Sequence, residues 1–222
     1  MTLLVLNPNR HTAMTDAVVA QLATALGPAE RLWGWTAADG PPVIDSVPSF
    51  AQGAVAAESA LAMALQAHPD TRAVLLACFG DPGLERLQQR AGGRPVWGLA
   101  QLAMAQAAAG GRRFAILTSG PAWVGLLQQR AQDWGLGTAL VGVWALPVNG
   151  LALAQDPARW QPLLQAAAEE AMQAGAQRLV LGGAAFAGLG RLVHSPLPVL
   201  DGVGCAAAAW SAHRRRQPDR HP

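Results

Sequence analysis

One cysteine stands at a position where the chain could carry out chemistry. Cys78 comes at the end of the apolar run 74–77, which is typical of a buried strand, and Asp81-Pro82 then predicts the start of a helix. In open α/β sheets, ligands bind at the carboxyl ends of the strands, so Cys78 would lie beside a ligand. The dipole of that helix would favour a thiolate, which predicts a pKa for Cys78 below its usual value of about 8.5. The alternative is that Cys78 is a small buried core residue.

Strands and helices alternate along the whole chain, and this alternation would position Cys78. The predicted helices include those at 50–67, 99–109 and 157–174. The predicted strands span residues 3–6, 31–35, 74–77, 95–97, 114–117, 139–144, 178–181 and 198–200. Such alternation indicates an α/β fold with parallel sheets.

The chain contains an internal repeat. A shift of 105 residues places the stretch 74–87 on 179–192, and Gly83 then meets Gly188 without a gap. A period of this length is far longer than that of a solenoid. We therefore predict two pseudo-symmetric lobes, each a parallel sheet flanked by helices, with the active cleft between them. The predicted boundaries are 1–97 plus 203–213 for the first lobe with its closing C-terminal helix, 98–202 for the second lobe, and 214–222 for a flexible basic tail.

Composition narrows the class of protein. Hydrophobic residues make up 51% and charged residues 14% of the 222 residues, with a mean hydropathy of +0.20, which is typical of a globular chain. The net charge of +2 includes four arginines in 214–222, so the body is close to neutral and no nucleic-acid partner is predicted. No apolar run reaches the ~20 residues that span a bilayer, and no signal peptide is indicated. Two cysteines fit neither a disulfide framework nor a metal site, which favours a reducing cytoplasm.

Several stretches are similar to a known family. The sequence reads Leu-Asn-Pro-Asn at 6–9 and Ala-Cys-Phe-Gly-Asp-Pro-Gly at 77–83. Both resemble blocks of the hydantoin racemases, in the aspartate/glutamate racemase superfamily, and further blocks follow in order over about residues 3–210. The resemblance implies a cofactor-independent and usually oligomeric enzyme that moves a proton at a carbon next to a carbonyl. It also implies one cysteine in each lobe, each serving one face of that carbon.

The sequence departs from the family pattern at two places. Where the second lobe of the family has Gly-Cys-Ala-Gly, residues 182–185 read Gly-Gly-Ala-Ala, so the second cysteine is replaced by Gly183. Cys205 lies well past that strand end, in an Ala-rich helix, and is interpreted as a core residue. Arg10-His11-Thr12 stands where the family tends to have small hydroxyl residues, which puts a cation and a titratable ring near the cleft entrance.

Loss of the second cysteine leaves four functions open. A racemase would need another acid or base, such as His11, His194 or water, on the second face. A decarboxylase resembling arylmalonate decarboxylase would need only one cysteine to protonate an enediolate. An isomerase of the maleate type could use Cys78 as a nucleophile, although that type keeps the second cysteine. A protein that binds a small anion without turnover is the fourth.

The leading interpretation assigns roles to residues at the strand ends. Cys78 is the catalytic acid or base. The backbone N–H groups of four residues would hold carbonyl or carboxylate oxygens, and these residues are Phe79, Gly80, Gly183 and Ala184. Asn7 and Thr118, at matching strand ends, would orient the substrate, and Ser119 could add a hydrogen bond. The expected partners are a small carboxylate or hydantoin substrate and further copies of the chain, with no cofactor, metal, nucleic acid or membrane.

Overall fold

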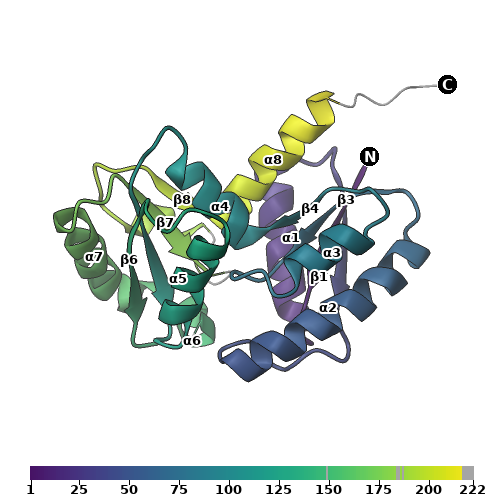
Figure 1. The fold of residues 1–222 in the computed structure, drawn as a ribbon, viewed down its shortest axis with the longest axis horizontal. Coiled ribbons are helices and arrows are strands. Elements are labelled where there is room, and N and C mark those ends of the chain that lie inside the picture. The colour runs from purple at the N-terminus through teal and green to yellow at the C-terminus, as the bar shows by residue number, and fades with distance from the viewer. Residues whose placement is uncertain (149, 184–185, 187, 217–222) are drawn as a thin grey trace. The chain divides into compact units, whose positions relative to one another are not determined.

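The computed structural model describes residues 1–148, 150–183, 186 and 188–216, and it contains two parallel four-stranded sheets (Figure 1). The first sheet has the order β2-β1-β3-β4, and its strands are β1 (Thr2–Asn7), β2 (Arg31–Thr36), β3 (Thr71–Leu76) and β4 (Val96–Gly98). The second has the order β6-β5-β7-β8, and its strands are β5 (Phe114–Ser119), β6 (Leu140–Leu146), β7 (Arg178–Gly182) and β8 (Val199–Asp201). The predicted α/β fold with parallel sheets is confirmed.

Helices connect the strands throughout. In the first half these are α1 (Thr12–Leu26), α2 (Val47–Ala67), α3 (Leu84–Arg90) and α4 (Leu99–Ala108). In the second half they are α5 (Trp123–Asp133), α6 (Gly150–Gln155), α7 (Pro157–Gln173), the 3-10 helix η2 (Leu189–Leu192) and α8 (Gly202–Arg216). The short helix α6 was not predicted, because six residues are too few to show a helical period.

The chain divides into two compact units. Met1–Leu99 with Val203–Pro222 forms one unit, which we call the first lobe, and Ala100–Gly202 forms the other, the second lobe. The division after Leu99 falls two residues later than the sequence suggested. Each lobe has a buried core of its own.

The two lobes repeat one topology. Both sheets place the first strand of their segment second in the order, and the two orders correspond strand by strand. The predicted match of Gly83 with Gly188 is visible in the backbone, because both residues precede a helix in the left-handed conformation, with φ of 76° and 74°. Glycine adopts this conformation without the steric cost that a Cβ brings. The internal repeat is therefore present in structure as well as in sequence.

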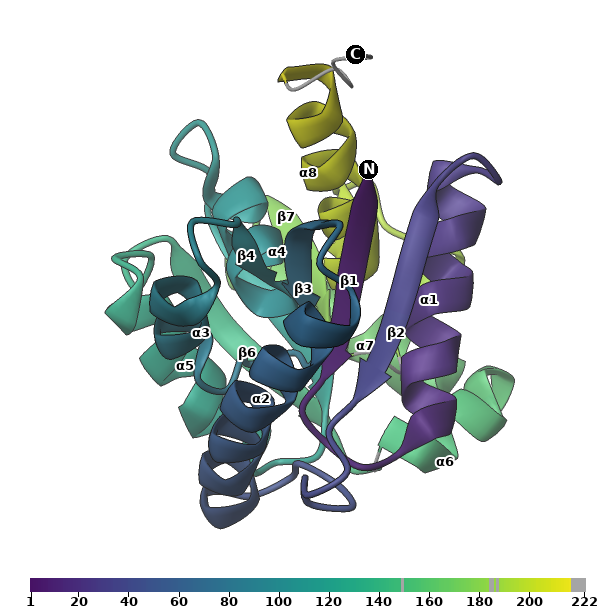
Figure 2. The ribbon, with the colours of Figure 1, turned by 90° about the vertical axis from the view of Figure 1, so that its right-hand side faces the viewer.

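The core of the first lobe lies around β1, every residue of which is buried. Helix α2 presents a face of small residues, including Ala57, Ala60 and Ala64, all fully buried, which lets it pack closely. Its partner α3 is joined to it by ion pairs of Arg86 and Arg90 with Glu58, at 2.8 and 3.3 Å. Figure 2 shows α2 and α3 side by side.

Helix α2 begins three residues before its predicted start at 50. The hydroxyl of Ser46 accepts a hydrogen bond from the backbone N–H of Ser49, and the Ser49 side chain accepts one from the Ser46 N–H. This reciprocal pair satisfies two backbone donors at the helix end, as in a capping box. Pro48 lies in the first turn, where a missing N–H costs nothing.

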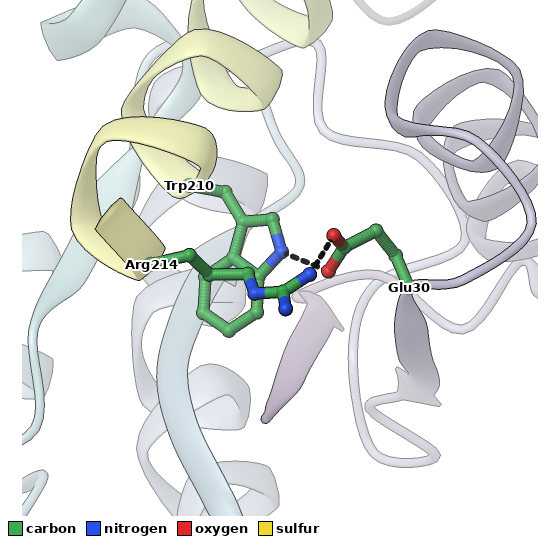
Figure 3. Close-up of polar contacts among 3 residues, drawn as sticks. All are labelled: Glu30, Trp210 and Arg214. Atoms are coloured by element: carbon green, nitrogen blue, oxygen red, sulfur yellow. Dashed lines mark hydrogen bonds and ion pairs between the residues drawn. The ribbon is translucent and has the colours of Figure 1, made fainter. Parts of the chain in front are cut away.

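Within the first lobe, a polar contact joins the C-terminal helix α8 to Glu30, in the N-terminal part of the sequence. The Trp210 side chain is fully buried, and its indole Nε1 donates a hydrogen bond to Glu30 Oε2 at 2.8 Å. Arg214 forms an ion pair with the other carboxylate oxygen of Glu30 (Figure 3). The helix continues through Arg216, so 214–216 are helical rather than part of the predicted flexible tail, and 217–222 lie outside the described residues.

Two further expectations concern α8 and the membrane. Cys205 is 5% exposed within α8, which confirms its interpretation as a core residue.

Over the part of the chain that the structure describes, no helix combines the length and the hydropathy needed to cross a bilayer.

Candidate active site

Cys78 lies in a tight turn that leaves the carboxyl end of β3. The Ala77 N–H donates to the carbonyl of Leu6 on β1 at 2.8 Å, so the neighbouring strands stay paired up to this turn. The Asp81 N–H then donates to the carbonyl of Cys78 at 3.1 Å. Gly80 has a φ of 122° and Asp81 one of 56°, and these left-handed conformations turn the chain sharply. Aspartate tolerates the left-handed region better than most residues do.

This turn corrects the predicted helix start. The helix α3 begins at Leu84, after Gly83, and the Leu84 N–H donates to the carbonyl of Asp81 at 3.2 Å. Asp81 is therefore a turn residue and not a helix cap, and Pro82 lies outside the helix. The sequence Asp-Pro-Gly suits both a helix start and a turn, so residue types alone could not separate the two.

The environment of Cys78 raises its pKa. Its side chain is 8% exposed, and burial disfavours the thiolate, while the nearby negative charge of Asp81 raises the pKa further. The predicted lowering of this pKa is wrong, because burial and the charge of Asp81 both raise it and the helix begins only at Leu84. Cys78 is accordingly a thiol near neutral pH.

A glycine on the neighbouring strand makes room for Asp81. Asp81 is fully buried, and a Cβ built on Gly98 at the end of β4 would lie 2.1 Å from its Oδ2. Gly98 therefore allows the carboxylate to lie against the strand end. This arrangement of Asp81 behind Cys78 was not predicted, and the glycine at a strand end was the only trace of it in the sequence.

Two backbone amides beside Cys78 have no hydrogen-bond acceptor among the described residues. Phe79 is 4% exposed and Gly80 is buried, yet within the described residues neither backbone N–H donates a hydrogen bond to any acceptor. Buried N–H groups are nearly always paired, so such a pair marks a place where an outside acceptor fits. The two donors belong to the residues that the sequence assigned to oxygen binding, and that assignment remains a prediction.

Asn7 organises the loop that follows β1. Its side-chain Nδ2 lies within hydrogen-bonding distance of Asn9 Oδ1, the His11 carbonyl and Thr15 Oγ1, at 3.0 to 3.2 Å, and its Oδ1 accepts from the Asn9 N–H at 3.1 Å. Both asparagines are buried, at 1% and 4% exposure. The Asn7 amide thus holds the loop in shape. Its predicted contact with substrate stays a prediction, and the part played by Asn9 and Thr15 was missed.

The predicted residues of the second lobe also meet at neighbouring strand ends. Thr118 on β5 is paired in register with Gly182 on β7, and its hydroxyl donates to the Gly182 carbonyl at 2.7 Å. Ser119 follows and is half-buried. Gly183 comes directly after β7, and Ala184 lies outside the described residues. Thr118, Ser119 and Gly183 remain predicted substrate-binding residues.

The backbone at Gly183 suits glycine better than cysteine. Its φ is 144°, in the region that side chains rarely adopt, and a Cβ would lie 3.3 Å from Cδ2 of the buried Phe186. The described backbone is thus adapted to the residue that the sequence has here.

The fold and the strand-end residues define a class, that of doubled parallel α/β proteins with a cysteine at the carboxyl edge of a sheet. The chain belongs to the Asp/Glu/Hydantoin racemase family, whose model matches residues 3–210.

Comparisons with individual proteins agree with this family. The hydantoin racemase of Rhizobium meliloti is 37% identical over 137 residues, which cover 60% of this chain and 56% of the relative. The hydantoin racemase of Paenarthrobacter aurescens is 28% identical over 209 residues, which cover 93% of this chain and 88% of the relative. Among solved structures, allantoin racemase from Pseudomonas fluorescens aligns with a TM-score of 0.89 at 26% identity, covering 97% of this chain and 92% of that one.

Proposed function

We propose that the protein is a cofactor-independent racemase that moves a proton at a carbon next to a carbonyl, with Cys78 as the acid and base. The observation that carries the proposal is the juxtaposition of the buried Cys78 with the unpaired N–H groups of Phe79 and Gly80. Family membership and the hydantoin and allantoin racemases among the relatives support it. The substrate we propose is a hydantoin or a related amino-acid derivative.

The chemistry follows from these groups. The thiolate of Cys78 takes the α-proton, and the electron pair of the broken C–H bond moves onto the carbonyl oxygen. That oxygen then carries the charge of an enolate, and hydrogen bonds from the Phe79 and Gly80 amides stabilise it where it develops. Return of the proton from the Cys78 thiol restores the starting enantiomer. Delivery from a second donor on the opposite face inverts the centre, and Cys78 afterwards loses its proton to solvent.

The raised pKa of Cys78 bears on the direction of proton transfer. Because burial and Asp81 favour the thiol, Cys78 is a better proton donor than base near neutral pH, and the rate of α-proton removal should rise with pH. For the second face, the candidates remain His11, His194 and water. Both histidines are exposed, His11 in the loop after β1 and His194 after η2.

The same observation favours one second candidate, a decarboxylase of the arylmalonate type. In that reaction the bond to a carboxylate breaks, CO₂ leaves, and the electron pair forms an enediolate. The Cys78 thiol protonates its carbon, and the resulting thiolate regains a proton from water. This reaction uses a cysteine that rests as a thiol and needs no second one.

Proton NMR in heavy water separates these functions. Each enantiomer of a panel of 5-substituted hydantoins, N-carbamoyl amino acids and free amino acids is incubated with the protein, and optical rotation is followed on the same samples. For a racemase, the α-proton signal is lost from both enantiomers while the rotation decays, and Cys78→Ala abolishes both effects. Cys205→Ala, which changes a cysteine within α8, is the matched control and should leave both unchanged.

Other results assign the other functions. Exchange in one enantiomer with preserved rotation would show Cys78 acting on one face alone. If none of these compounds exchanges and aryl-substituted malonates, tested next, are turned over, the protein is a decarboxylase. Isomerisation of maleate through addition of Cys78 to its double bond would indicate the maleate type of isomerase. Ligand binding without exchange or turnover, unaffected by Cys78→Ala, would make this a binding protein and overturn the proposal.

A further inference from the structure

The loop after β1 forms one wall of an open pocket in the first lobe. This pocket has a volume of about 310 Å³ and is lined by Arg10, His11, Thr12 and Pro42. It lies on the carboxyl side of the sheet, because Arg10 follows the end of β1 just as Cys78 follows the end of the adjacent strand β3. The pocket therefore opens on the same edge of the sheet as the candidate catalytic cysteine.

The guanidinium of Arg10 is available to a ligand. Its side chain is exposed, and in the described part of the chain it forms no hydrogen bond and no ion pair. The first turn of α1, which follows directly, contains no acidic residue that would neutralise it. Arginine presents a planar fork of donors that matches a carboxylate in two-point geometry.

The backbone of Arg10 is fixed from two sides. Its N–H donates to the carbonyl of Pro41 at 3.1 Å, and the Asn7 and Asn9 side chains hold the residues on either side. A Cβ on Gly40 would lie only 2.4 Å from the Pro8 carbonyl oxygen, so the two loops are in direct contact. A fixed backbone lowers the ordering cost of a binding group, and such a group discriminates between ligands more sharply.

From these features we infer that Arg10 selects substrates that carry a carboxylate on the substituent of the reacting carbon. The inference rests on the proposed function, and it names the substrate class of that site. The reacting carbonyl has its own donors in the Phe79 and Gly80 amides, so the arginine is left for a second, negatively charged group. Arg10 is thus a specificity-determining residue and takes no part in proton transfer.

The test is a matched pair of hydantoins, one with a charged carboxylate and the other with a neutral amide on the same substituent. The probes are 5-(2-carboxyethyl)hydantoin and its amide, 5-(2-carbamoylethyl)hydantoin, which have the same size and the same reacting ring. Binding is measured by calorimetry and α-proton exchange by NMR in heavy water, on the same protein. We expect the carboxylate to bind about tenfold more tightly than the amide, because hydrogen bonds to charged groups are worth this much at a partly exposed site.

Substitutions identify the group responsible. Arg10→Gln removes the positive charge while keeping a polar side chain and should make the two affinities equal, whereas Arg10→Lys should keep part of the preference. Arg72→Gln removes another exposed arginine of the first lobe, at the amino end of β3, and should leave the preference unchanged. Added salt should reduce the preference of the unaltered protein, since a charge contact at an open pocket is screened.

Each outcome bears on one proposal. Equal affinities in the unaltered protein, a preference that survives Arg10→Gln in a folded variant, or no binding of either hydantoin would overturn the inference. Exchange of both probes with equal affinity would overturn it and leave the proposed function standing. A preference that depends on Arg10, without exchange of the α-proton, would support the inference and count against the racemase.

Discussion

At the scale of single residues, Asp81 acts on the candidate catalytic cysteine through its charge, which raises the pKa of Cys78. A buried thiol with a carboxylate close by keeps its proton, so the resting enzyme holds a proton donor at the strand end. Activation of such a cysteine as a base has to come from the substrate or from a rise in pH. The two predictions at this scale test the charge and the burial separately.

Replacing Asp81 with asparagine should make Cys78 more reactive. Asparagine tolerates the left-handed conformation of this position, so the turn should persist while the negative charge is lost. The pKa of Cys78 should then fall, and alkylation by iodoacetamide between pH 7 and 9 should become faster. Cys78→Ala shows the background from the buried Cys205. An alkylation rate equal to that of the unaltered protein would mean that burial alone sets the pKa.

Burial of the thiol should also make stability depend on pH. The folded pKa of Cys78 lies above the unfolded value of about 8.5, so its contribution is fully present below that pH and is lost as the pH rises. Above about pH 8.5 the unfolded chain has released this proton and the folded chain has not, which costs about 1.4 kcal/mol per pH unit. Urea unfolding between pH 8 and 10 should show a slope that is smaller by this amount in Cys78→Ala. Equal slopes would contradict the burial.

At the scale of elements, strand ends and their loops build the site, while helices supply the packing. The loop after β1 is held by buried amides, and the loop after β2 packs against it through Gly40. Small residues lie where one backbone meets another, so a larger side chain there should lower stability more where less space is available.

Gly40→Ala should destabilise the first lobe. The added methyl would meet the Pro8 carbonyl oxygen and the Asn9 Cα, and backbone atoms cannot move aside as a flexible side chain can. We expect a loss of about 1–3 kcal/mol in the free energy of unfolding, measured by urea titration. Gly125→Ala in α5, where a Cβ meets nothing within 4 Å, is the control and should be neutral or stabilising. Equal effects of the two substitutions would refute the close approach.

At the scale of the whole chain, the first lobe is built from both ends of the sequence. Residues 1–99 supply its sheet, and α8 returns from 203 to pack against it through Trp210 and Glu30. The Glu30 side chain is only 11% exposed, so its carboxylate has little water around it. Trp210 and Arg214 of α8 supply the hydrogen bond and the ion pair that replace that water.

Trp210→Phe should therefore lower stability. The substitution removes the indole donor and leaves one buried oxygen of Glu30 without it, which costs about 1–3 kcal/mol in addition to the lost packing. Thermal unfolding should show the decrease. Arg215→Gln, an exposed change on the same helix, should have no effect. A melting temperature unchanged by Trp210→Phe would show that α8 is held by other contacts.

Sequence reasoning succeeded where a pattern has one structural solution. Apolar runs ending in polar residues located the strands and placed Cys78 at a strand end, and the repeat correctly paired Gly83 with Gly188. It failed at Asp81, because the same residues serve a helix start and a turn, and so the sign of the pKa shift was wrong. The network of Asn7 with Asn9 and Thr15, and the contact of Glu30 with Trp210, depend on three-dimensional approach that no local spacing encodes.

The contact between Glu30 and Trp210 also bears on how the protein is made. The two residues are separated by 180 positions, so a ribosome adding about 5–20 residues per second exposes Glu30 roughly 10 to 40 s before its partner exists. During that interval the whole second lobe is synthesised, while the first sheet has emerged without its last helix. The second lobe, which is continuous in the chain, can complete its core first. The first lobe can complete its core only after the second lobe has been synthesised.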